Sequence, residues 1–143
     1  MWEFECSTET GASRASVWAL WSDPNRWPEF DKGVSWARLD GTLGQGAKVE
    51  LKPKGGPKSQ VEVVTFEPGQ SFTMVAKLPL AKLRFQHSVL PGEDGTSLLT
   101  SRIEASGALS WFFPRLFGLR SNAVDLQTNL ARLAEATTEP AAG

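Results

Sequence analysis

The sequence predicts an α+β fold in which a curved, seven-stranded antiparallel sheet wraps round one long C-terminal helix, with two short helices between strands 1 and 2. Seven segments alternate apolar and polar side chains with the period of a half-buried strand. Six of them follow one another through short turns, which is typical of consecutive antiparallel hairpins. The end of the chain instead repeats apolar residues every three or four positions, as a helix with one apolar face does.

The N-terminal part of the chain predicts one strand and the two short helices. Residues 2–8 place Trp, Phe and Cys in alternation with Glu, Glu and Ser, so one face of this strand is buried. Ser13 stands at an N-cap position before a segment with apolar residues at helical spacing. Asp23 followed by Pro24 is a second cap with Pro in the first turn, which predicts a short helix over 24–30.

Six further strands are predicted between turns rich in Gly, Pro and Asp. The turn at Glu67-Pro68-Gly69 has Pro at its second position and Gly at its third, as β-turns prefer. Because each strand is apolar on one face only, the sheet needs a cover on that face. The predicted strands are 34–39, 47–52, 60–66, 72–77, 83–89 and 97–106.

One long helix is the only predicted element large enough to cover the sheet. Pro114 cannot sit inside a helix, so we expect it in the first turn or at a kink after a short segment over 108–113. A helix of about 20 residues is about 30 Å long and does not fill the hollow of a twisted sheet, so a cavity is expected. Residues 1–137 form the predicted domain, and 138–143 a disordered tail. The apolar stripe comprises Leu116, Leu119, Ala123, Leu126, Leu130 and Leu133.

Composition argues against several classes of partner. The 15 basic and 16 acidic residues are scattered, with a net charge of −1, so no nucleic-acid ligand is expected. The single cysteine excludes an internal disulfide and suits a reducing compartment. The chain starts without a basic and apolar leader and has no apolar run near the roughly 20 residues of a membrane span. We expect a cytoplasmic protein without integral membrane association, either a monomer or a homodimer.

Aromatic composition predicts what a cavity would recognise. Six Trp and eight Phe occur without a single Tyr, so aromatic walls would offer few hydroxyl groups. Such a cavity would select for shape and apolar area.

Four local patterns, taken in order, resemble a known superfamily. They are 13–18, 23–30 with its Trp-Pro pair, 92–96 between two strands, and Gly107 before the last helix. Together they resemble the START-like (SRPBCC) superfamily, and within it the polyketide cyclase/dehydrase group of helix-grip proteins. The resemblance covers about residues 2–136 and implies a cavity for a hydrophobic ligand; we expect no cofactor.

His87 is the strongest candidate for chemistry. It shares strand parity with Phe85, which aims both at the covered face. There the imidazole could act as a general acid or base, hold a ligand carbonyl or hydroxyl, or be a wall histidine satisfied by its neighbours. Because it is the only histidine, a site with several His ligands is excluded, and no spaced carboxylate cluster predicts a metal site.

Ser101 is predicted on the same face, on the neighbouring strand. A serine nucleophile needs an adjacent base and a third orienting group. His87 could approach it, but no Gly-x-Ser-x-Gly elbow surrounds Ser101 and no acid shares the inward parity. This favours a hydrogen-bonding wall residue over a serine hydrolase.

The remaining candidates are wall residues. The resemblance and strand parity together suggest Trp27 and Trp36, with core packing as the alternative, and parity adds Met74. Arg120 lies one step from the helix stripe and could reach the cavity mouth or lie on the surface. The bulky run Trp111–Phe113 with Phe117 cannot all face one core, so part of it should face the cavity rim, a partner or solvent.

Three functions are open from the sequence. The first is a binder of an apolar small molecule, lipid-like, polyketide or aromatic, without catalysis. The second, implied by the resemblance, is a cyclase or dehydrase with His87 as acid or base. The third is a protein-interaction module that uses the surface of Trp111–Phe117.

Overall fold

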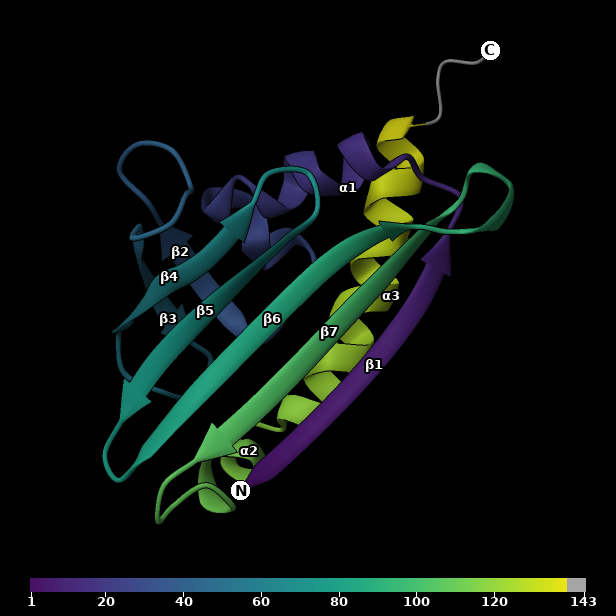
Figure 1. The fold of residues 1–143 in the computed structure, drawn as a ribbon. Helices are drawn as coiled ribbons and strands as arrows, with labels where there is room; N and C mark the ends of the chain where they lie inside the picture. The colour runs from purple at the N-terminus through teal and green to yellow at the C-terminus, as the bar shows by residue number, and fades with distance from the viewer. Residues whose placement is uncertain (139–143) are drawn as a thin grey trace.

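The seven strands form one antiparallel sheet in the order β1-β7-β6-β5-β4-β3-β2 (Figure 1). The computed structural model describes residues 1–138. From β3 to β7 each strand pairs with its predecessor, and β1 forms the other edge beside β7, so the predicted meander is confirmed. The strands are β1 (Trp2–Thr10), β2 (Val34–Arg38), β3 (Lys48–Pro53), β4 (Ser59–Glu67), β5 (Ser71–Leu78), β6 (Ala81–Pro91) and β7 (Ser97–Ser106).

Two short helices follow β1, as the cap signals predicted. Ser13 Oγ accepts a hydrogen bond from the Ser16 amide at 3.1 Å and starts α1 (Arg14–Trp21). The Asp23 carboxylate accepts from the Asn25 amide at 3.3 Å and starts η1 (Pro24–Glu29), which is a 3₁₀ helix. A further 3₁₀ turn, η2 (Glu93–Gly95), lies between β6 and β7.

The predicted C-terminal helix is divided into α2 (Phe112–Leu116) and α3 (Leu119–Thr138). Pro114 lies in the first turn of α2, where its missing N–H removes no helical hydrogen bond. The break follows because Gly118 adopts a left-handed conformation, with φ of 59°. The prediction that Leu116 belongs to the apolar stripe of the long helix is therefore wrong. Leu116 lies on α2 and is exposed.

α3 covers only one half of the concave face of the sheet. Its contacts concentrate on β1, β7 and α1, and Figure 1 shows it behind β7 and β1. The stripe from Leu119 to Leu130 is buried as predicted, but Gln127, expected mainly off the stripe, is buried as well. α3 extends to Thr138, and residues 139–143, the rest of the predicted tail, lie outside the described residues.

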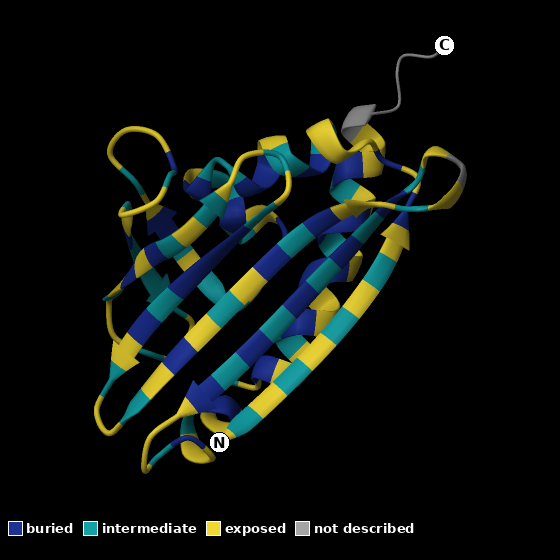
Figure 2. Ribbon diagram, viewed as in Figure 1, coloured by how far each residue is buried: buried dark blue, intermediate teal, exposed yellow. Residues whose placement is uncertain are grey.

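Burial alternates along the strands as a sheet covered on one face requires (Figure 2). β7 is the clearest case, with every second residue from Ser97 to Ala105 buried. On the opposite face Arg102 contacts Glu3 at 2.9 Å and Glu5 and Glu104 at 3.5 Å, which makes this face a charged outer surface. No helix within residues 1–138 is long and apolar enough to cross a bilayer.

Candidate ligand-binding cavity

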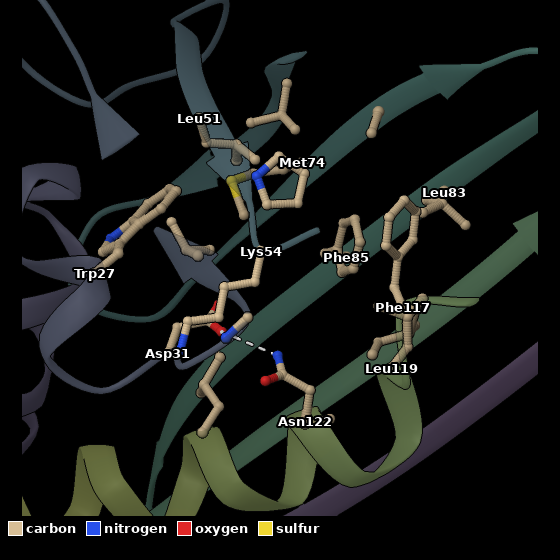
Figure 3. A pocket seen from close by; sticks show the side chains of 18 of the residues that line it. Trp27, Asp31, Leu51, Lys54, Met74, Leu83, Phe85, Phe117, Leu119 and Asn122 are labelled. Carbon is tan, nitrogen blue, oxygen red and sulfur yellow. Dashed lines mark hydrogen bonds between the residues drawn. The ribbon is translucent and has the colours of Figure 1, made fainter. Parts of the chain in front are cut away.

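A cavity of about 450 Å³ lies between α3 and the half of the sheet that α3 does not cover. Its walls come from η1, strands β2 to β7, and the start of α3. Figure 3 shows Trp27 and Phe117 on opposite sides of it, with Met74 and Phe85 on the strands between them. Most of the wall is apolar; it includes Trp21, Trp27, Leu51, Met74, Leu83, Phe85, Ile103 and Leu126.

The cavity opens where its lining residues are exposed. These residues come from the segment after η1, from the β3–β4 hairpin and from the start of α3. The mouth therefore lies between the hairpin and the α2–α3 junction. The exposed lining residues are Lys32, Lys54, Pro57, Gly118 and Asp125.

A hydrogen-bonded relay from α3 to β6 supports the deep wall of the cavity. The two hydrogens of the Gln127 amide nitrogen are shared among three acceptors, the backbone carbonyls of Cys6 and Leu99, at 3.1 and 3.2 Å, and Ser101 Oγ at 3.1 Å. The Gln127 oxygen accepts from Thr8 Oγ1 at 2.8 Å. Ser101 Oγ lies 2.9 Å from His87 Nδ1. All three side chains of the relay, Gln127, Ser101 and His87, are buried.

The relay favours one tautomer of His87. Two backbone carbonyls fix the orientation of the Gln127 amide, because a flipped amide would set its oxygen against theirs. Ser101 Oγ accepts from this amide, so its own hydrogen is directed to His87 Nδ1, the only other acceptor bonded to it within residues 1–138. His87 is then the tautomer with its proton on Nε2.

Burial keeps His87 neutral. Desolvation lowers the pKa of His87 to about 3, and its ring stacks on Trp21 with centroids 4.2 Å apart. Within the described part of the chain, no hydrogen bond joins Nε2 to another residue. The side chain lines the cavity, so a neutral N–H donor is available there.

Asp31 is a second polar group of the cavity and is half-buried. Its Oδ1 accepts from the Gly33 amide and from Asn122 Nδ2, both at 2.9 Å (Figure 3). Gly33 permits this approach, because a Cβ there would lie 2.9 Å from Asn122 Nδ2. Burial raises the pKa of the Asp31 carboxyl, against the lowering effect of its two hydrogen bonds. No residue within 1–138 makes a hydrogen bond with Oδ2.

Five of the eight predicted site residues line the cavity: Trp27, Met74, Phe85, His87 and Phe117. Trp27 is also fixed by its indole N–H, which donates to the Trp21 carbonyl at 3.0 Å. Ser101 does not line the cavity; it lies behind His87 and positions that ring.

Trp36 and Arg120 lie away from the cavity. The β2–β3 register shifts between Val34 and Trp36, so the inward side passes from Val34 to Ala37 and Trp36 is turned outward. There Arg38 covers its ring at 4.8 Å. Arg120 lies over the Phe4 ring at 5.3 Å, so it does not reach the mouth.

Sequence reasoning missed Trp21, Asp31, Asn122 and Gln127. Trp21 is one of the apolar residues at helical spacing after Ser13; it is buried in α1 and also forms the cavity wall against His87. The signal for Asn122 and Gln127 was their position beside the α3 stripe, where a polar side chain can turn inward. No group of three His, Cys, Asp or Glu side chains within the described residues is arranged to hold a metal ion.

Comparison with known proteins agrees with this architecture. Residues 1–137 match the family described as polyketide cyclase / dehydrase and lipid transport. The chain belongs to this family. The predicted resemblance is thereby confirmed, and the fold commonly binds hydrophobic ligands.

Solved structures share the fold at low sequence identity. A protein of Mesorhizobium loti has a TM-score of 0.75 at 15% identity, covering 95% of this chain and 98% of its own. A START superfamily protein from Mycobacterium smegmatis has a TM-score of 0.67 at 15% identity, covering 96% and 97%. A norcoclaurine synthase point mutant from Thalictrum flavum, in complex with a transition state analogue, has a TM-score of 0.72 at 11% identity, covering 95% of both chains. No match was found among curated proteins.

Proposed function

We propose that the chain binds a hydrophobic small molecule in the cavity between α3 and strands β3 to β6. The observation that carries this proposal is a cavity of about 450 Å³ with a mainly apolar wall. Cavities of roughly 300–1,000 Å³ are typical of small-molecule sites. An apolar cavity of about 150 Å³ already accepts benzene, so this one has room for a body of about three rings or an equivalent chain.

Two polar groups define the ligand further. His87 offers one hydrogen-bond donor, which suits a carbonyl or ether oxygen of the ligand. Asp31 offers an acceptor oxygen near the mouth, which suits a hydroxyl or amine. The ligand is therefore an apolar molecule with an acceptor oxygen at its inner end and a donor at its outer end.

Binding is favoured over acid–base catalysis by His87. A general base works best when its pKa lies near the operating pH. Burial lowers the pKa of His87 to about 3, and Nδ1 is already occupied by Ser101, so near neutral pH the ring is a weak base and a hydrogen-bond donor. The cyclase or dehydrase alternative would need another residue to move the proton.

The proposal is tested with two tricyclic probes that differ by one carbonyl, fluorenone and fluorene. Both should bind and raise the melting temperature, fluorenone several-fold more tightly because one hydrogen bond contributes about 1 kcal/mol. His87→Asn keeps an acceptor for Ser101 but removes the Nε2 donor, so it should bind the two probes equally. Ala76→Phe adds bulk to the cavity wall and should bind neither.

The control is Val124→Ala, an exposed position on α3 that does not line the cavity. It should bind both probes as the parent does. Equal binding by Ala76→Phe and the parent, measured by tryptophan fluorescence and calorimetry, would show that the probes do not enter the cavity. No binding of either probe by the parent would contradict the proposal outright.

A further inference from the structure

Three segments far apart in the sequence meet at the cavity mouth. They are the β3–β4 hairpin (51–58), the β5–β6 hairpin (76–83) and the α2 region (105–124). The Leu109 amide donates to the Leu80 carbonyl at 2.9 Å, which joins the last two. A Cβ on Gly56 would lie 3.4 Å from the Phe117 ring, which joins the first to the last. Leu51, Leu78 and Phe117, one from each segment, line the same cavity.

These three segments, here called the basic end, have a one-sided charge. They contain seven of the 15 basic residues of the chain and none of its 16 acidic residues. The protein as a whole carries a net charge of −1, so this clustering is not a consequence of composition. Lys58 is paired with Glu50 at 3.5 Å, and Asp31 and Asp125 are the acids nearest the mouth. The seven are Lys52, Lys54, Lys58, Lys77, Lys82, Arg115 and Arg120.

The basic end also carries exposed apolar side chains. Leu80 is 69% exposed, Leu116 60%, Trp111 57% and Phe112 39%. With Val124 on α3, which is 47% exposed, the basic end contains five of the seven large hydrophobic side chains that are exposed within residues 1–138. Trp111 and Phe112 pack edge to face, with centroids 5.8 Å apart, so the two rings present one apolar surface to solvent. Leu80 lies in the β5–β6 turn that receives the Leu109 amide.

We propose that the basic end docks on the surface of an anionic lipid bilayer. Exposed Trp, Phe and Leu side chains surrounded by Lys and Arg are the combination that binds the interface of an anionic membrane. Trp and Phe enter the boundary between head groups and acyl chains, while the basic side chains remain at the phosphate level. The cavity mouth lies within this surface, so an apolar ligand could pass between the bilayer and the cavity with little contact with water.

A lipid surface fits better than a folded protein partner. The apolar residues lie on a turn and a short helix, so they project from separate elements and do not form the continuous stripe of one helix or strand. The charges are likewise spread over three segments rather than arranged as pairs. Such a pattern selects for a diffuse negative surface. The inference is independent of the proposed function, because docking needs no ligand in the cavity.

The test is flotation of the full chain with vesicles of phosphatidylcholine and with vesicles in which about a third of the lipid is phosphatidylglycerol. Binding to the anionic vesicles should be at least about tenfold tighter and should weaken as salt is added. The double variant Trp111→Ser with Leu116→Ser should bind at least about tenfold more weakly, and so should Lys82→Glu with Arg115→Glu.

Matched controls come from exposed residues outside the basic end. Leu90→Ser removes an exposed apolar side chain at the end of β6, and Arg132→Glu reverses an exposed charge on α3. Both should bind vesicles as the parent does, and thermal unfolding should show all variants folded. The inference is overturned if the parent binds neither vesicle, if the controls weaken binding as much as the test variants, or if binding to vesicles requires a second protein.

Discussion

Mild acidification should destabilise the fold through His87. Burial lowers the pKa of this side chain to about 3 in the folded chain, whereas an exposed histidine has a pKa of 6.5. Below pH 6.5 the unfolded chain therefore binds a proton at His87, whereas the folded chain does not. The stabilisation from His87 is complete above pH 6.5 and is lost as the pH falls from there toward 3.

The magnitude follows from the two pKa values. At pH 5 the unfolded histidine is almost fully protonated and the folded one is not, which lowers the free energy of unfolding by about 2 kcal/mol relative to pH 7. The loss grows to about 4 kcal/mol near pH 3. Asp31 acts with the opposite sign: its raised pKa lets the folded chain bind a proton more readily, so its contribution improves as the pH falls.

Urea unfolding at pH 5, 6 and 7 measures the effect, with His87→Asn as the comparison. This variant keeps an acceptor for Ser101 and has no imidazole, and the chain contains no other histidine. Asp31 is present in both proteins, so its contribution cancels in the difference. The parent should lose about 2 kcal/mol more than the variant between pH 7 and pH 5. Equal losses would mean that folded His87 is protonated near pH 6.5 and that burial does not lower its pKa.

Three further substitutions test other parts of the structure by equilibrium unfolding. Gln127→Glu sets a buried carboxylate against two backbone carbonyls and should cost about 3 kcal/mol or more at pH 7, with partial recovery in acid; no recovery would contradict the electrostatic cause. Asp31→Asn removes a half-buried charge but keeps an acceptor, so it should stabilise the fold at pH 8 and have little effect at pH 4; a loss of stability at pH 8 would indicate an ion pair. Gly107→Ala should cost about 2–4 kcal/mol, because its φ is 100° and the new Cβ would lie 2.7 Å from the Leu80 carbonyl oxygen. Gly41→Ala, with φ of 92° and open space, should cost only about 1 kcal/mol, and equal costs would show that the contact with Leu80 is unimportant.

The alternation of apolar and polar residues was sufficient to predict the strands of the sheet, because each strand has one covered face. The period of two is then visible in every strand, and the predicted limits of 97–106 agree with β7 at both ends. β2 is the exception in detail. The bulge between Val34 and Trp36 shifts by one residue which side chains face inward. The sequence of this five-residue strand contains no signal that predicts the shift. That single irregularity turned Trp36 away from the cavity.

Long-range hydrogen bonds were beyond the reach of patterning. Gln127 lies outside the predicted apolar stripe, yet its partners are two carbonyls and two hydroxyls, one of each on β1 and one of each on β7. Asp31 follows a short helix, so its position in the sequence suggests a surface residue. Its contact with Asn122 on α3 explains why the side chain is half-buried instead. Periodicity reports which face of an element is apolar; it does not report which polar side chain meets a partner from a distant element.

The same polar residues explain why the cavity stays open. A helix on a curved sheet would gain stability by settling into the hollow, because apolar surface would be buried. α3 is instead tied on one side to β1 and β7 by Gln127, and on the other to the segment after η1 by Asn122 and Asn129. Moving α3 inward would break these bonds and leave the buried Gln127 amide without partners. Gln127 thus has two effects: it holds the helix at the distance that preserves the cavity, and through Ser101 it fixes the proton that His87 presents to it.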